Sequence, residues 1–172
     1  MANTVSYTVE YRRKRSGKTD YKKRLSLLKS KKPRMVVRKS NKNIYIQLIE
    51  YNVEGDHVLV SASSKDLSSY GWKLAKSNIP SAYLTGYLCG RKCLKNKLDS
   101  AVVDLGLQPV VKSSRLFAAV KGAIDAGLDI NAGESIFEKE ERLRGEHIKT
   151  KEESNIADEM DKIKKKIDKK FK

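Results

Sequence analysis

The chain has 172 residues, of which 37 are Lys or Arg and 21 are Asp or Glu, so its formal net charge is +16. That length fits one domain with tails, and that charge indicates a polyanionic partner. No stretch approaches the ~20 apolar residues of a membrane span, the first residues lack the apolar run of a signal peptide, and two cysteines are too few for a secreted disulfide scaffold. The composition therefore predicts a soluble cytoplasmic protein with no membrane partner.

The positive charge is concentrated near the N-terminus. Residues 12–39 contain fourteen Lys and Arg and a single acid, Asp20, whereas residues 40–148 contain fourteen basic and thirteen acidic residues. A polyanion should therefore bind mainly to residues 1–33, a basic arm. A solvated tail or a localisation signal would also be basic, but tyrosines and spaced leucines interrupt this run, which favours a binding arm.

Within the arm, Tyr21, Leu25 and Leu28 follow a helical spacing and predict a short helix, which Pro33 should end. Arginines in this segment can bind phosphates through two parallel hydrogen bonds, and Tyr11 and Tyr21 can stack on unpaired bases. The arm is thus typical of an RNA-binding segment whose affinity falls as salt rises.

Three strands follow the arm, at residues 34–38, 44–51 and 57–63. The second strand alternates strictly, with Ile44, Ile46 and Leu48 on one face. Short turns at residues 40–43 and 52–56 join the three strands, which predicts an antiparallel meander.

After the third strand, the spacing of the apolar residues changes from that of a strand to that of a helix. Asn78 and Pro80 indicate a helix start, and one apolar stripe is expected along the helix. Gly86 and Gly90 lie four residues apart on it, and because glycine weakens a helix, close packing should compensate. The residues of the expected stripe are Leu84, Leu88, Leu94 and Leu98.

A short apolar strand at residues 101–107 should pair in parallel, since a helix separates it from the meander. Ser113 or Ser114 can cap a further helix, which Gly127 ends. Residues 34–133 are therefore predicted to form an α/β fold, a β-β-β-α-β-α sandwich with a mixed sheet.

Residues 134–172 form a charged C-terminal extension. Residues 150–153 resemble a capping box, and a narrow apolar stripe among lysines predicts a terminal amphipathic helix. This helix could bind a partner or dock on the domain itself, since it is too short to fold alone. The stripe consists of Ile156, Met160, Ile163, Ile167 and Phe171.

Other residues leave alternatives open. Trp72 and Lys73 could contact RNA bases, but Trp72 could equally cover the core. Arg91 and Lys92 are more simply explained as a solvated helix face. Cys89 and Cys93 are expected to be buried free thiols, because structural zinc needs four ligands and no ligand-spaced histidine is present.

No enzymatic motif is found. The sequence contains no Walker loop, dinucleotide-binding glycine pattern, nucleophile elbow or zinc-binding H-E-x-x-H. A metal-dependent nuclease would need clustered carboxylates, but the first strand has none and the fourth has only Asp104. We therefore expect no enzyme, cofactor, metal site or small-molecule substrate.

Several motifs, in chain order, resemble one known family. It is the large-subunit ribosomal protein family that binds 5S rRNA, called L-eighteen in bacteria and archaea and L-five in eukaryotes; the length resembles the archaeal form. The motifs that carry the resemblance are YRRKRSGKTDYKKRLSLLKS, PRMVVRKSNKNIYIQLIEY, KDLSSYGWK, AYLTGYLCGRKCL, AVVDLGL, SSRLFAAVKGAIDAGLDI and ERLRGEHI. One departure is Asn43, where the family more often has histidine.

The resemblance implies a ribonuclease-H-like fold without catalysis. It also implies a structural role in the cytoplasmic large ribosomal subunit, with 5S rRNA, large-subunit rRNA and neighbouring proteins of the central protuberance as partners. The RNA-contacting residues it implies are Tyr11, Arg12, Arg13, Arg15, Lys18, Thr19, Asp20, Tyr21, Arg24, Arg34, Arg38, Ser40, Asn41 and Lys42. Among them, Asp20 is expected to brace an arginine or to accept a hydrogen bond from a ribose or guanine, not to face a phosphate. A general nucleic-acid-binding protein is the alternative.

Overall fold

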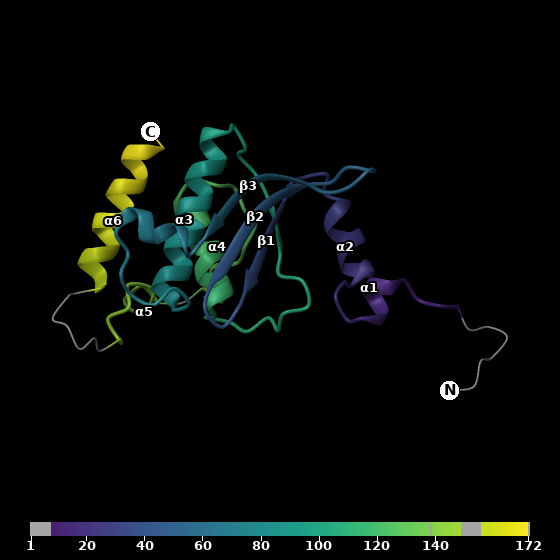
Figure 1. Ribbon diagram of the computed structural model, residues 1–172, viewed down its shortest axis with the longest axis horizontal. Coiled ribbons are helices and arrows are strands. Elements are labelled where there is room, and N and C mark those ends of the chain that lie inside the picture. The colour runs from purple at the N-terminus through teal and green to yellow at the C-terminus, as the bar shows by residue number, and fades with distance from the viewer. Residues whose placement is uncertain (1–7, 138, 149–155, 172) are drawn as a thin grey trace.

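A mixed four-stranded sheet forms the centre of the fold in a computed structural model that describes residues 8–137, 139–148 and 156–171. Strands β1 (Arg34–Lys39), β2 (Ile44–Glu50) and β3 (His57–Ser63) form an antiparallel meander. Strand β4 (Val102–Asp104) pairs in parallel with β1, so the strand order is β3-β2-β1-β4 (Figure 1). The predicted α/β sandwich with a mixed sheet is confirmed.

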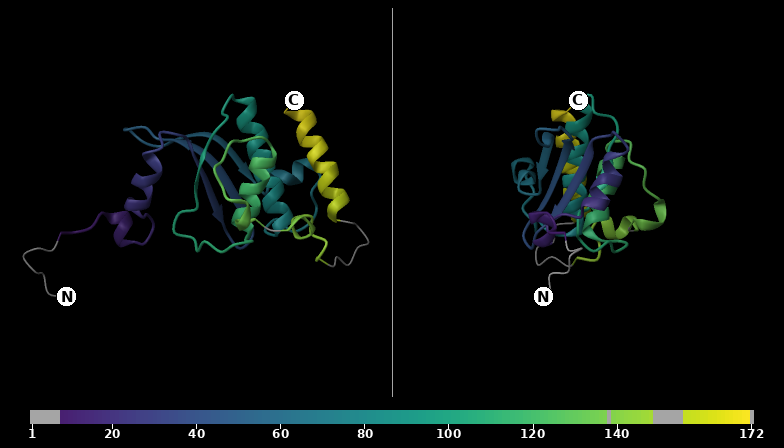
Figure 2. Two further views of the ribbon diagram at one scale, coloured as in Figure 1. Left: turned by 180° about the vertical axis from the view of Figure 1, so that it is seen from behind. Right: turned by 90° about the vertical axis from the view of Figure 1, so that its right-hand side faces the viewer.

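Helices α3 (Ile79–Lys95) and α4 (Arg115–Asp125) cover one face of this sheet (Figures 1 and 2). Asn78 caps α3, since its side-chain oxygen accepts a hydrogen bond from the Ser81 amide at 2.9 Å. Ser114 is the N-cap residue of α4, although its hydroxyl has no hydrogen-bond partner among the described residues.

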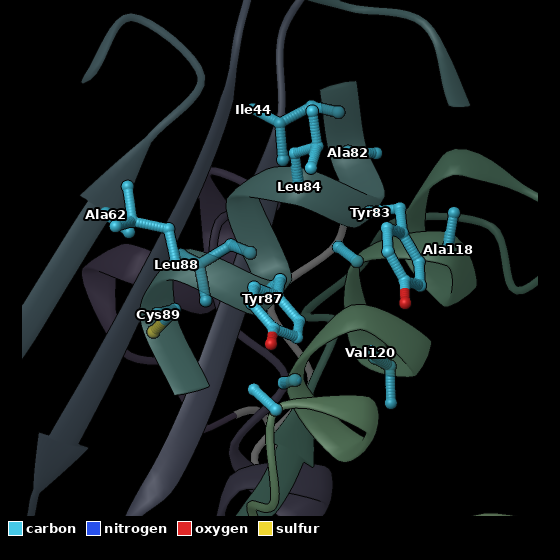
Figure 3. Packing of buried hydrophobic residues seen from close by; sticks show 14 of the residues in the cluster. Ile44, Ala62, Ala82, Tyr83, Leu84, Tyr87, Leu88, Cys89, Ala118 and Val120 are labelled. Carbon is cyan, nitrogen blue, oxygen red and sulfur yellow. The ribbon is translucent and has the colours of Figure 1, made fainter. Parts of the chain in front are cut away.

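The core lies between the sheet and these two helices. Figure 3 shows Ile44 of β2 and Ala62 of β3 close to Leu84 and Leu88 of α3, and all four are buried. The predicted stripe along α3 is right for Leu84 and Leu88 only. Leu94 is half-buried and Leu98 lies beyond the end of the helix. Cys89 and Cys93 also lie on the buried part of α3. Both are free thiols, as predicted from the sequence.

Three glycines allow α3 and α4 to approach each other at backbone distance. A Cβ atom at Gly86 would lie 1.9 Å from the Ala119 carbonyl oxygen, and one at Gly122 would lie 2.0 Å from the Tyr83 carbonyl oxygen. Gly90 is similar, with the Ala126 side chain 2.6 Å from the position of its Cβ. The close packing expected for Gly86 and Gly90 is thus present.

The C-terminal helix docks on the domain. Helix α6 (Ile156–Lys170) packs against α3 and the 3₁₀ helix η1 (Asp66–Tyr70). Its apolar residues Ile156, Met160, Ile163 and Ile167 are buried there, so of the two predicted alternatives, binding a partner or docking on the domain, the structure shows docking on the domain. The short helices η2 (Glu134–Ile136) and α5 (Glu140–Leu143) precede it. The predicted capping box lies outside the described residues.

The basic arm is helical and lies on the other side of the sheet from α3 and α4 (Figures 1 and 2). It contains α1 (Arg12–Arg15) and α2 (Tyr21–Leu28), which confirms the predicted short helix. Helix α2 ends five residues before Pro33, because Lys31 already adopts a left-handed backbone with φ of 54°. Within the described residues, no helix is long and apolar enough to cross a membrane.

The glycine contacts predict that Gly86→Ala and Gly122→Ala each lower the free energy of unfolding by ~1–3 kcal/mol or more, because a backbone carbonyl blocks the added methyl group. Gly133→Ala is the matched control, since no atom lies within 4 Å of its Cβ position and its change should stay within ~0.5 kcal/mol. Urea unfolding measures all three. A Gly86→Ala protein as stable as the control would contradict the packing described above.

Candidate nucleic-acid interface

The first part of the arm presents its cations to solvent around a pair of tyrosines. Tyr11 is 74% exposed, and its ring centroid lies 5.2 Å from that of Tyr21. The Arg13 Nε atom donates a hydrogen bond to the Thr19 hydroxyl at 2.9 Å, which closes the loop between α1 and α2. The exposed residues of this loop and helix include Arg12, Arg13, Arg15 and Lys18. The arrangement offers several phosphate-binding groups beside an aromatic ring that a base could reach.

Asp20 has a structural role that the sequence analysis missed. Its Oδ1 atom accepts hydrogen bonds from the backbone amides of Lys22 and Lys23 at 3.0 and 3.1 Å, so it caps α2. The structure shows this helix cap in place of the expected contact with an arginine, and the alternative that Asp20 accepts a hydrogen bond from a ribose or guanine stays a prediction. An aspartate directly before a helical spacing is a recognised N-cap signal, and it was present in the sequence.

A chain of ion pairs connects the arm to the sheet. Arg24 of α2 donates to Asp56 in the β2–β3 turn at 2.8 Å, and Arg34 of β1 donates to the other oxygen of Asp56 at 2.7 Å. Arg34 also donates to Asp104 of β4 at 2.9 Å, and Arg38 pairs with Asp104 at 3.3 Å. Positive and negative groups therefore alternate from Arg24 through Asp56, Arg34 and Asp104 to Arg38. We call these five residues the ion-pair chain.

Burial makes the middle of the ion-pair chain a structural feature. Arg34 is only 3% exposed, and a buried guanidinium is tolerated where carboxylates neutralise it. The hydrogen bond from Arg24 holds the pKa of Asp56 below its usual range, and the same bond raises the pKa of Arg24. The expectation that Arg34 contacts RNA is therefore corrected, because its guanidinium is enclosed by Asp56 and Asp104.

Arg38 differs from Arg34 because 42% of its side chain is exposed. Its Nη1 atom donates to the carbonyl oxygens of Asp104 at 2.8 Å and Val37 at 2.9 Å, which fixes the guanidinium at the sheet surface. Lys23 of α2 donates to the Gly106 carbonyl at 3.0 Å and adds a second contact between the arm and the domain. A largely polar cavity of about 230 Å³ lies between arm and sheet.

The β1–β2 turn is held by Ser40 and Asn43. The Ser40 hydroxyl accepts from the Asn43 amide at 3.0 Å and donates to the Asn43 carbonyl at 2.9 Å. The Asn43 side-chain oxygen accepts a hydrogen bond from the Ser64 hydroxyl at 3.5 Å. Asn41 and Lys42 are exposed at the tip of the turn and remain predicted RNA contacts.

Trp72 belongs to the core. It is 1% exposed, and its Nε1 atom donates to the Ala75 carbonyl at 3.1 Å. The prediction that Trp72 contacts RNA is wrong, because its ring is enclosed and its polar atom is used. Lys73 is exposed and remains a predicted contact.

Two residues that support the site were not identified from the sequence. Asp56 lies in a segment that indicated only a turn, and Lys23 was one of many lysines in the arm. Neither carries a local signal for its partner, because Asp56 is 32 residues from Arg24 and Lys23 is 83 residues from Gly106. Among the described residues, no group of three or more His, Cys, Asp and Glu could hold a metal ion.

Residues 5–101 match the family of ribosomal large subunit proteins 60S L5 and 50S L18. The chain belongs to this family. It is 50% identical over 148 residues to large ribosomal subunit protein uL18 of Korarchaeum cryptofilum, which covers 86% of this chain and 76% of the relative. It is 47% identical over 163 residues to the uL18 protein of Methanobrevibacter smithii, and this match covers 95% of this chain and 84% of the relative. The uL18 protein of Methanococcus maripaludis is 47% identical over 169 residues, and this match covers 98% of this chain and 87% of the relative.

Family membership confirms the predicted class of protein. The chain is a structural constituent of the large ribosomal subunit and not an enzyme, and its relatives are large-subunit proteins of the cytoplasmic ribosome. The exposed arm, the fixed Arg38 and the β1–β2 turn are thus the candidate RNA interface of a ribosomal protein.

The ion-pair chain predicts that the arm detaches from the sheet in acid. The pKa of Asp56 is lowered from 3.8 in the folded protein, so its contribution to docking is complete above that value and is lost as the pH falls through the lowered pKa. The protection factors of the α2 backbone amides, which correct for the slower intrinsic exchange in acid, should therefore fall below about pH 4, and they should also be lower at neutral pH in Asp56→Asn.

Glu54→Gln is the control for this test, because Glu54 lies exposed in the same turn. Its α2 amides should exchange as in the wild type at neutral pH. Equal protection of α2 in Asp56→Asn and wild-type protein would show that the ion-pair chain does not hold the arm.

Proposed function

We propose that the chain binds 5S rRNA through its arm and the β1–β2 turn, and attaches it to large-subunit rRNA at the central protuberance. The observation that carries the proposal is that the basic arm is a folded element joined to a nearly neutral domain. Its exposed cations therefore occupy defined positions relative to Arg38, Asn41 and Lys42. A fixed set of cations can match the phosphate positions of one folded RNA.

The chemistry of each exposed group determines which part of the RNA it binds. Arg12, Arg13, Arg15 and Lys18 neutralise phosphates and release counterions, which supplies affinity without reading sequence. Tyr11 is suited to stacking on an unpaired base. Asn41 has both donor and acceptor groups, so it can contact a base edge and help to define the register.

A general nucleic-acid-binding protein is the second candidate function. The arm's net positive charge alone would support it, since phosphate neutralisation needs no specific partner. The enclosed ion-pair chain favours the first candidate, because a generic binder gains nothing from holding its cations in one arrangement.

The proposal predicts a one-to-one complex with a 5S rRNA transcript whose affinity falls steeply with salt. Each neutralised phosphate contributes ~0.9 to the slope of log Kobs against log salt, so about five arm contacts give a slope near −4.5. The variant Arg12→Gln/Arg13→Gln/Arg15→Gln should reduce the magnitude of the slope by about 2.7. Filter binding at several salt concentrations measures both slopes.

The matched control removes three exposed cations elsewhere, as Lys97→Gln/Lys112→Gln/Lys139→Gln. Its slope should stay close to that of the wild type. Equal competition by transfer RNA for the wild-type protein would contradict specific 5S rRNA binding and support the general binder.

A further inference from the structure

Helix α6 lies at the end of the molecule opposite the arm (Figure 1), and a cleft lies between it and α3. The cleft has a volume of about 450 Å³ and is lined by Arg91 of α3, Lys165, Asp168 and Lys169 of α6, and Phe171. Three of these five side chains are cations and one is aromatic. The arm and this cleft are thus separate surfaces, with the domain between them.

The single acid in the cleft is already neutralised. Asp168 lies 2.8 Å from the Arg91 Nε atom and accepts a hydrogen bond from the Tyr87 hydroxyl at 2.9 Å. Arg91 also donates to the Tyr87 hydroxyl at 3.2 Å, so its guanidinium is held in place at the edge of the cleft. Asp168 therefore orients Arg91 and offsets one positive charge, which leaves Lys165 and Lys169 uncompensated.

The six lysines of α6 fall into two groups of three. Three of them contact the domain: Lys164 lies over the Tyr83 ring at 4.6 Å, Lys166 donates to the Tyr70 carbonyl at 3.0 Å, and Lys170 lies over the Tyr70 ring at 5.1 Å. Lys162, Lys165 and Lys169 are exposed and have no partner among the described residues, and of these three only Lys165 and Lys169 line the cleft. These two are four residues apart on one helix face, an arrangement of like charges that destabilises a helix. An anion in the cleft would remove that repulsion.

Phe171 adds a group that a simple anion site does not need. It is half-buried in the cleft wall, and the Lys95 ammonium lies 5.6 Å from its ring centroid. An aromatic ring next to several cations is the combination that binds single-stranded nucleic acid, in which a base stacks while the phosphate is neutralised.

We propose that the α3–α6 cleft is a second RNA-binding site, which takes a phosphate on Lys165 and Lys169 and stacks the adjoining unpaired base on Phe171. RNA fits better than an acidic peptide, because a peptide carboxylate would use the lysines but would not use the Phe171 ring. Together with the arm, this site allows one protein molecule to hold two RNA segments at opposite ends. The site does not depend on 5S rRNA being the ligand of the arm.

The experiment measures binding of a fluorescent twelve-nucleotide oligouridylate to the full chain carrying Arg12→Gln/Arg13→Gln/Arg15→Gln, which removes three of the phosphate-binding groups of the arm. In this background, Lys165→Gln/Lys169→Gln should lower the affinity about tenfold, as expected for the loss of charge-assisted hydrogen bonds. The magnitude of the salt slope should fall by about 0.7, since the cleft neutralises one phosphate and each single-strand phosphate contact contributes ~0.7. Lys112→Gln/Lys162→Gln removes the same charge from exposed positions outside the cleft and should change the affinity by less than about twofold.

Phe171→Leu separates stacking from charge. It should weaken oligouridylate binding by about 5- to 150-fold, the range measured for loss of one stacked base, and leave binding of inorganic polyphosphate unchanged. Equal losses in the cleft and control double variants, or equal effects of Phe171→Leu on both probes, would overturn the proposal. Stronger binding of a poly-glutamate peptide than of oligouridylate would overturn it in favour of a protein partner. Failure of 5S rRNA to bind the wild-type arm would leave these results unaffected.

Discussion

The burial of Arg34 between Asp56 and Asp104 is the interaction on which the arrangement of the molecule depends. A guanidinium that is almost fully removed from water must have its charge balanced, and two carboxylates from different elements do so here. Since removing one partner of a buried ion pair costs ~3–5 kcal/mol, β1, β4 and the β2–β3 turn are tied together at this point. Arg24 shares Asp56, so the position of the arm is tied to the same residues.

The rest of the fold provides a rigid support for this connection. Helix α3 is buried along most of its length because the sheet, α4 and α6 surround it, and Gly86 and Gly122 bring the α3 and α4 backbones into contact. The inner face of β2 is fully buried against these helices. A sheet fixed in this way holds Arg34 and Arg38 in place. The exposed cations of the arm are therefore held at defined positions relative to the sheet.

Much of this architecture could be predicted from the sequence, because local spacing determined it. The alternation in β2, the cap at Asn78 and the paired glycines of α3 are patterns over a few residues, and each predicted its element correctly. Two of the predictions that failed required contacts between distant residues. Arg34 belongs to the basic run in the sequence, yet its partners lie 22 and 70 residues away. Trp72 is next to an exposed lysine, but the way its ring is enclosed is decided by tertiary packing.

The central claim is that the ion-pair chain turns a basic segment into an interface with a defined geometry. The most direct measurement is the ratio of affinities for a 5S rRNA transcript and for transfer RNA, at one salt concentration, in wild-type protein and in Asp56→Asn. The account predicts that the variant binds transfer RNA as well as the wild type or slightly better, since it has gained one unit of positive charge, but binds 5S rRNA less tightly. An unchanged ratio would contradict the account, because it would show that charge alone governs binding by the arm.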